Sequence, residues 1–123
     1  MNWSMTGAIL AGLAVALGAF GAHELRERVD AYRMGVYEKA AFYHFIHAIA
    51  ILVISILPRT GAMADGAESA VCGLLLAGIA FFSGSLYVLA ITGNRWLGAI
   101  TPIGGVAFIA GWVLLAWRLR RLV

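Results

Sequence analysis

The sequence predicts an all-α membrane protein, an antiparallel four-transmembrane-helix bundle with an amphipathic interfacial helix between helices 1 and 2. The first observation behind this prediction is composition. Of 123 residues, 63% are hydrophobic and only 12% are charged, whereas soluble proteins average about 25% charged residues. A soluble domain of this size buries only about 60% of the surface of its unfolded chain. Too much apolar surface would therefore remain in water, and lipid is the expected solvent.

The second observation is that the apolar residues fall into four long uncharged stretches. About 17–25 residues cross roughly 30 Å of hydrocarbon as a helix, and a backbone without water must form helical hydrogen bonds. Short connections with turn formers such as Pro58 and the Gly93-Asn94 pair make neighbouring helices antiparallel. Residues 1–123 are therefore predicted to form a single integral membrane domain, with membrane helices at about 3–22, 40–57, 69–91 and 97–117.

The third observation is the only long polar stretch, residues 24–38. Its apolar residues Leu25, Val29, Tyr32 and Val36 recur at the spacing of one helix face. Opposite charges also recur four residues apart, which supports a helix. We expect this interfacial helix to lie flat in the headgroup region and to lead directly into the second membrane helix.

Charge and aromatic residues define membrane edges but give no direction. The first and third loops carry five Lys and Arg residues, while the second loop and the C-terminal segment carry four. This difference is too small for the positive-inside rule to fix the orientation. Trp3, Trp96 and Trp117 fall at predicted helix ends, as expected of the aromatic belts of a membrane protein.

Small residues recur at helical spacing in the predicted membrane helices. Lipid tails provide little hydrophobic drive between helices, so close packing depends on small residues and on hydrogen bonds between helices. These stripes also make self-association an expectation. The candidate packing positions are Gly7, Ala11, Gly18, Gly73, Ala77, Gly84, Gly105 and Gly111.

Two histidines, His44 and His47, lie inside the second apolar stretch. On a helical wheel they share the side that carries small residues, while Phe42 and Phe45 lie on the opposite side, so we expect the histidines to face protein. If the first two helices form a hairpin, His23 lies at the same membrane level, and the third helix offers hydroxyl groups. The candidate polar pocket is His23, His44, His47, Ser83, Ser85 and Tyr87.

Intramembrane histidines allow three interpretations. They can be structural, with rings that bond Ser, Tyr or backbone carbonyls and fix the helix register. They can instead belong to a ligand or proton pathway, because ionisable groups in membranes are often functional. Haem or metal ligation is chemically permitted, but no Cys and His spacing typical of a metal site occurs. We favour the structural interpretation and expect no metal site and no cofactor.

The chain carries several sequence blocks in order: "GAFGAHEL" (18–25), "YHFIHA" (43–48), "FSGSLYVLAITG" (82–93) and "LGAITPIGG" with a later "GW" (97–105 and 111–112). With these blocks it resembles, nearly end to end, an uncharacterised family of small bacterial inner-membrane proteins typified by YgdD, with eukaryotic relatives called transmembrane protein 256. The resemblance implies a four-helix, multi-pass protein of the bacterial inner (cytoplasmic) membrane. It implies no activity.

These observations predict a non-enzymatic membrane protein that acts as an accessory or scaffold for lipid or protein partners. No Ser-His-Asp order, phosphate-binding glycine loop or carboxylate pair occurs at membrane depth, so no catalytic residue is predicted. The expected partners are membrane lipids, a second copy of the chain or another membrane protein. Nucleic acid is not expected, because the nine Lys and Arg residues do not share one face.

Two other functions stay open. The first is binding or transport of a small molecule, a lipid or a proton through the His/Ser/Tyr pocket between helices. The second is a haem- or metal-dependent intramembrane enzyme.

Overall fold

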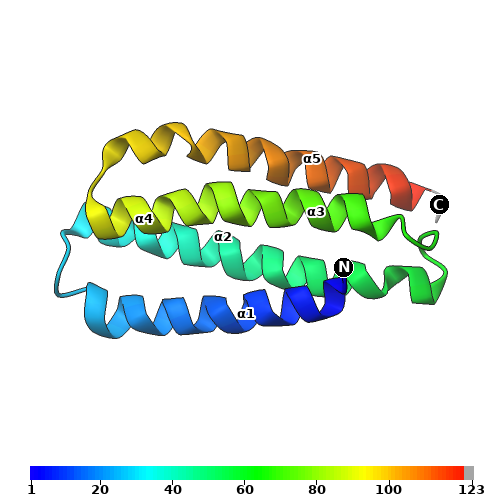
Figure 1. Cartoon of the computed structure of the whole chain (residues 1–123), viewed down its shortest axis with the longest axis horizontal. Coiled ribbons are helices and arrows are strands. Elements are labelled where there is room, and N and C mark those ends of the chain that lie inside the picture. The colour runs from blue at the N-terminus through cyan, green and yellow to red at the C-terminus, as the bar shows by residue number, and fades with distance from the viewer. Residues whose placement is uncertain (121–123) are drawn as a thin grey trace.

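The structure, a computed structural model, describes residues 1–120, and in this range it consists of helices and the turns that join them. Four helical spans lie side by side along the long axis of the molecule (Figure 1). Each is long and apolar enough to cross a membrane: Trp3–Leu25, Ala31–Thr60, Glu68–Thr92 and Arg95–Leu119. The predicted all-α class and the four membrane helices are confirmed.

The first two spans form an antiparallel pair. Helix α1, Trp3–Phe20, is capped by the preceding residue, Asn2. The Asn2 side chain accepts a hydrogen bond from a backbone N–H of the first turn. A π-helical turn, Gly21–Leu25, extends α1. Helix α2, Ala31–Ile56, is capped in the same way by the side chain of the preceding residue, Asp30. Both helix starts therefore follow from short polar side chains that satisfy free N–H groups.

The third and fourth spans are each built from several helical pieces. Helix α3, Glu68–Gly78, continues through a second π-helical turn, Ile79–Ser83, into α4, Gly84–Thr92. A 3₁₀ turn, Arg95–Ala99, precedes α5, Thr101–Leu119. Proline 102 occupies the first turn of α5, where its missing N–H costs no hydrogen bond.

Tight turns separate the later spans where the sequence predicts them. A 3₁₀ turn, Leu57–Thr60, contains Pro58 and follows α2, and the next residue, Gly61, has φ of 82°. Gly93 ends α4 with φ of 74° and donates its N–H to the Leu89 carbonyl at 2.7 Å. A left-handed backbone conformation at a helix end is typical of glycine.

Residues 24–38 do not form a separate interfacial helix, which corrects that part of the prediction. Residues 24–25 finish the first span, 26–30 make a turn, and α2 runs from Ala31 to Ile56 without interruption. Because Asp30 caps α2, the helix begins at Ala31 rather than near residue 40. No proline separates its first, polar helical turns from the apolar turns that follow. The inward side chains of this region pack inside the protein rather than on headgroups. Leu25, Met34 and Tyr37 form a buried cluster with Ala90 of α4.

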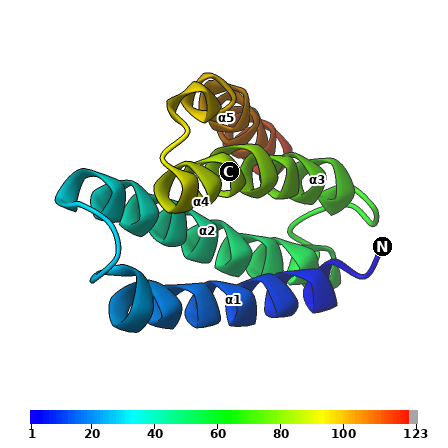
Figure 2. The ribbon, with the colours of Figure 1, turned by 60° about the vertical axis from the view of Figure 1, so that its left-hand side comes forward.

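The spans form a stack. Helix α2 and the α3–α4 span lie in the middle, α1 packs on α2, and α5 packs on α3 and on the turn Ile79–Ser83 (Figure 2). The main core cluster includes Ile51, Val71, Leu75 and Phe108. Large apolar side chains on the outer faces of all four spans are exposed, as expected for surfaces that contact lipid.

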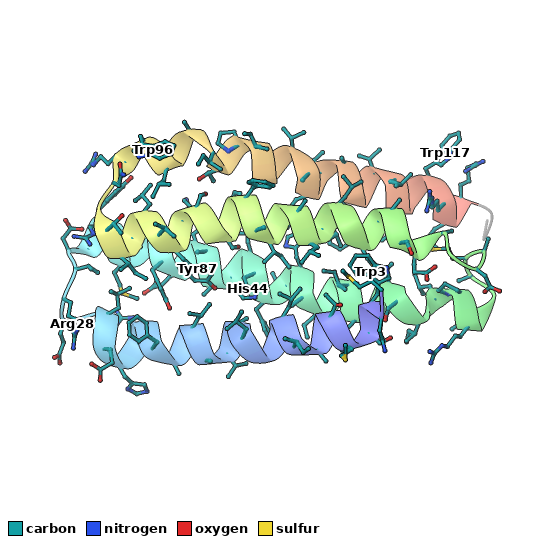
Figure 3. The ribbon with its side chains drawn as sticks, viewed as in Figure 1. Trp3, Arg28, His44, Tyr87, Trp96 and Trp117 are labelled. Carbon is teal, nitrogen blue, oxygen red and sulfur yellow. The ribbon has the colours of Figure 1, made fainter. Side chains whose placement is uncertain are left out.

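Three of the four tryptophans lie toward the ends of the stack. Trp96 lies at the same end as Arg28, while Trp3 and Trp117 lie at the opposite end (Figure 3). This arrangement matches two aromatic belts separated by the apolar length of the helices.

Only some of the predicted small residues lie where helices approach closely. A Cβ atom added to Gly7 would lie 2.8 Å from the Leu52 backbone, and one added to Gly111 would lie 2.7 Å from the Leu75 side chain. Gly18 and Gly73, by contrast, have no neighbour within 4 Å of such an atom. The other predicted positions, Gly84, Gly105, Ala11 and Ala77, are only partly buried.

The closest approach in α5 is at Gly104 rather than at the predicted Gly105. A Cβ atom on Gly104 would lie 2.2 Å from the backbone nitrogen of Phe82, whereas one on Gly105 would meet only the Phe82 ring at 3.9 Å. Gly21 and Gly78 are two further contacts that the stripes did not indicate. Spacing along a helix defines a stripe, but the rotation of the helix decides which member of the stripe meets the neighbour.

Candidate functional site

His44 is buried on α2 and faces Tyr87 of α4 (Figure 3). Its Nδ1 lies 2.8 Å from the Tyr87 hydroxyl, and the two rings meet edge to face with centroids 5.8 Å apart. The Nε2 atom is buried and has no hydrogen-bond partner in residues 1–120. The Leu10 backbone of α1 lies beside the ring without completing a hydrogen bond of good geometry. His44 therefore connects α2 to α4 through one nitrogen.

His47, one turn further along α2, has both ring nitrogens bonded. Trp112 of α5 donates its indole N–H to Nε2 at 3.0 Å, and Nδ1 lies 2.7 Å from the Tyr43 carbonyl. Because an indole N–H can only donate, Nε2 accepts, and Nδ1 carries the ring proton and donates a hydrogen bond to the Tyr43 carbonyl. The ring also stacks on Phe108, with centroids 3.7 Å apart. His47 therefore connects α2 to α5 in one tautomer.

The two serines at the second π-helical turn differ in their partners. The Ser85 hydroxyl lies 2.7 Å from the Thr101 hydroxyl and joins α4 to α5. Ser83 is fully buried, and its hydroxyl has no partner in residues 1–120. Because α2 and α4 are antiparallel, Ser83 lies one turn from Tyr87 toward the level of His47. Five of the six predicted pocket residues therefore lie on the facing parts of α2 and of the second π-helical turn with α4, and two of them, His47 and Ser85, bond to α5.

His23, the sixth, does not join them. It is exposed in the turn that ends the first span. The Tyr37 hydroxyl donates to the Leu17 carbonyl, which sets α1 and α2 in a register that brings Leu10 beside His44. His23 is then about 13 residues, or roughly 20 Å, along α1 from that level. The prediction of a shared level failed because α2 begins at Ala31 rather than near residue 40.

Comparison with known proteins identifies the family. A family model described as "Protein of unknown function (DUF423)" matches residues 17–105. The chain belongs to the DUF423 family.

Relatives of this DUF423 chain carry membrane-protein names. A UPF0382 membrane protein of Staphylococcus saprophyticus is 49% identical over 109 residues, which cover 89% of this chain and 88% of the relative. The UPF0382 membrane protein YwdK of Bacillus subtilis is 44% identical over the same length, with the same coverage. No solved structure shows significant similarity to the chain. The family and the four apolar spans together establish an integral, multi-pass membrane protein.

Arg33 of the DUF423 chain makes a contact with the end of α4 that the sequence did not suggest. Its guanidinium donates to the Ala90 carbonyl at 2.7 Å and to the Ile91 carbonyl at 2.5 Å. These carbonyls belong to the last turn of α4, where the helix dipole favours a cation. Arg33 was missed because residues 24–38 were assigned to the membrane surface, away from α4.

We expect Arg33→Ala to lower the free energy of unfolding by about 1.5–3 kcal/mol, because it removes charge-assisted hydrogen bonds to two helix-end carbonyls. Arg26→Ala is the matched control. Among residues 1–120 the Arg26 side chain makes only an exposed ion pair with Glu38, and such pairs contribute about 0–1 kcal/mol. Denaturation in detergent micelles measures both variants. Equal losses would show that the Arg33 contact adds no specific stability.

The polar side chains of this region do not form a metal centre. In residues 1–120, no three or more His, Cys, Asp or Glu side chains converge closely enough to hold a metal ion. Cys72 bonds only weakly to the Ile51 carbonyl, with the sulfur 3.9 Å from the oxygen. The haem or metal interpretation of the histidines therefore gains no ligand set from this part of the chain.

Proposed function

We propose that the chain is a non-enzymatic accessory or scaffold protein of the bacterial cytoplasmic membrane, acting on lipid or protein partners through its outer surfaces. The observation that carries this proposal is the bonding of the membrane histidines. His44 and His47 bond side chains of neighbouring helices, Tyr87 and Trp112. Polar groups used in this way stabilise the position of one helix against another.

Two more specific statements stay predictions: the likeness to YgdD and transmembrane protein 256, and the location in the inner membrane. The sequence blocks indicate a likeness to YgdD and transmembrane protein 256, and this likeness brings no activity with it. A location in the inner membrane is consistent with relatives named as membrane proteins in Staphylococcus and Bacillus.

A second candidate is binding or transport of a small molecule, a lipid or a proton through the His/Ser/Tyr side chains between the helices. Two buried polar atoms favour it, the Nε2 of His44 and the hydroxyl of Ser83, which have no partner in residues 1–120. Buried polar atoms usually have a partner, which can be a water molecule or a ligand. A species bound at the Nε2 of His44 would depend on the ring orientation that Tyr87 gives to His44 through Nδ1.

Proton flux in liposomes separates the two candidates. For an accessory protein, we expect liposomes with the wild-type chain to dissipate an imposed pH gradient no faster than protein-free liposomes. In the same preparations, Tyr87→Phe and Trp112→Phe should each lower the free energy of unfolding by about 1 kcal/mol, the size of a hydrogen bond between membrane helices. Trp96→Phe, at an exposed position, is the control and should change little.

The opposite pattern would contradict the accessory function. If the wild-type chain accelerates proton flux and Tyr87→Phe abolishes the acceleration while the protein stays folded, the transport candidate replaces it.

A further inference from the structure

A cavity of about 600 Å³ lies between the α2–α3 connection and the C-terminal end of α5. These two segments lie at the same end of the stack (Figure 1). Met63 and Ala67 line the cavity from the connection, and Trp117, Arg118 and Arg120 line it from α5. None of these residues takes part in the histidine region described above.

The lining of this cavity is positively charged. Among the described residues, two arginines and no acidic side chain line it. The acids of the same connection, Asp65 and Glu68, line a separate cavity of about 350 Å³. In residues 1–120, neither Arg118 nor Arg120 forms an ion pair. An anion entering the cavity would therefore meet two positive charges and no competing carboxylate from residues 1–120.

Contacts within α5 hold one of these charges at the cavity. Arg120 donates to the Trp117 carbonyl at 2.6 Å, and its guanidinium carbon lies 3.7 Å from the centre of the Trp117 ring. A guanidinium has five N–H donors, so most of its donors have no partner in the described part of the chain. This geometry suits the oxygen atoms of a phosphate group, which arginine binds with two parallel hydrogen bonds.

The surroundings favour a lipid phosphate over a free ion. Trp117 is 61% exposed at the membrane end of α5, where aromatic belts meet headgroups. Met63 and Leu114 give the cavity apolar walls, and its volume lies within the range of ligand pockets. Basic pockets between membrane helices commonly bind anionic headgroups.

We propose that this cavity binds the phosphate group of an anionic glycerophospholipid, with Arg118 and Arg120 as its ligands and Trp117 beside the start of the acyl chains. The inference rests on the proposed accessory function in one respect, since it names the class of lipid partner for that function.

Lipid binding by the full chain in detergent tests the proposal. The probes are dioleoylphosphatidylglycerol, dioleoylphosphatidylcholine and inorganic phosphate, and the readouts are native mass spectrometry and the lipid-induced rise in melting temperature. We expect phosphatidylglycerol to bind the wild-type chain more tightly than phosphatidylcholine. The double variant Arg118→Gln/Arg120→Gln should weaken this binding at least about tenfold, because each arginine near a headgroup contributes about 1 kcal/mol.

The double variant Arg26→Gln/Arg28→Gln is the matched control. It removes the same formal charge from the opposite end of the stack, where both arginines already pair with glutamates, and it should bind phosphatidylglycerol as the wild type does. Unchanged melting temperatures without lipid will show that both double variants are folded.

Three results would overturn the proposal: equal loss of binding in the two double variants, equal binding of the two lipids by the wild type, or binding of inorganic phosphate that phosphatidylglycerol does not displace. The accessory function fails by proton flux instead, so the failure of one proposal is distinguishable from the failure of the other.

Discussion

Gly104→Ala should destabilise the protein by about 3 kcal/mol or more, at the upper end of the cost of overpacking. The added methyl carbon would lie 2.2 Å from the Phe82 nitrogen and 2.7 Å from the Phe81 carbonyl carbon. Both are backbone atoms of the turn Ile79–Ser83, so no change of side-chain rotamer can relieve the overlap. Helix α5 would have to move away from the α3–α4 span, and the hydrogen bond between Ser85 and Thr101 would be lost with it.

Gly105→Ala is the control for this experiment. Its added carbon would meet only the Phe82 ring at 3.9 Å, an ordinary contact, and alanine favours a helix by up to about 1 kcal/mol over glycine. We expect this variant to match or exceed the wild type when denaturation is followed by helical circular dichroism in detergent. If Gly104→Ala also unfolds like the wild type, α5 does not pack on the turn as closely as the structure indicates.

Removing the Tyr37 side chain should have the second large effect, a loss of about 3–5 kcal/mol for Tyr37→Ala. Tyr37 is only 1% exposed, its ring lies 5.1 Å from that of Tyr87, and its hydroxyl donates to the Leu17 carbonyl. A Cβ atom on Gly21 would lie 2.3 Å from the same ring. The Tyr37 side chain therefore fills the space between the end of the first span, α2 and α4.

A double-mutant cycle makes this prediction specific. Gly21→Ala alone should cost about 1–3 kcal/mol, because its methyl group overlaps the Tyr37 ring. In a Tyr37→Ala background the same change should cost much less, since the ring is absent. The measurement is denaturation of the four proteins under one condition. Additive losses would show that Gly21 and Tyr37 do not share this contact.

Which residues belong to the candidate site could largely be predicted from single helices, but their partners on other helices could not. The wheel of residues 40–57 indicated that His44 and His47 face protein, and both are buried. The pairing of His47 with Trp112 could not be predicted, because it joins residues 65 positions apart on helices whose rotation the sequence leaves open. The one available signal was a tryptophan inside the predicted fourth membrane helix, because its indole N–H needs an acceptor at membrane depth.

The prediction for His23 shows a different limit. Its membrane level depended on where α2 begins. Because α2 begins nine residues earlier than predicted, His23 lies roughly 20 Å along α1 from the level of His44. The glycine stripes failed in a similar way, since Gly104 and Gly105 are equally small and only the rotation of α5 distinguishes them.

The sequence by itself determined the membrane class and the four spans, together with the side of α2 that carries the histidines. These properties are local, because a long apolar stretch in lipid must satisfy its own backbone hydrogen bonds as a helix. Only the tertiary structure decided the register of α1 on α2, the contact at Gly104 and the bonding of Trp112 to His47. It also brought the arginines of α5 together with the α2–α3 connection around one cavity. These features depend on how each helix is rotated and shifted against its neighbour, which no single segment specifies.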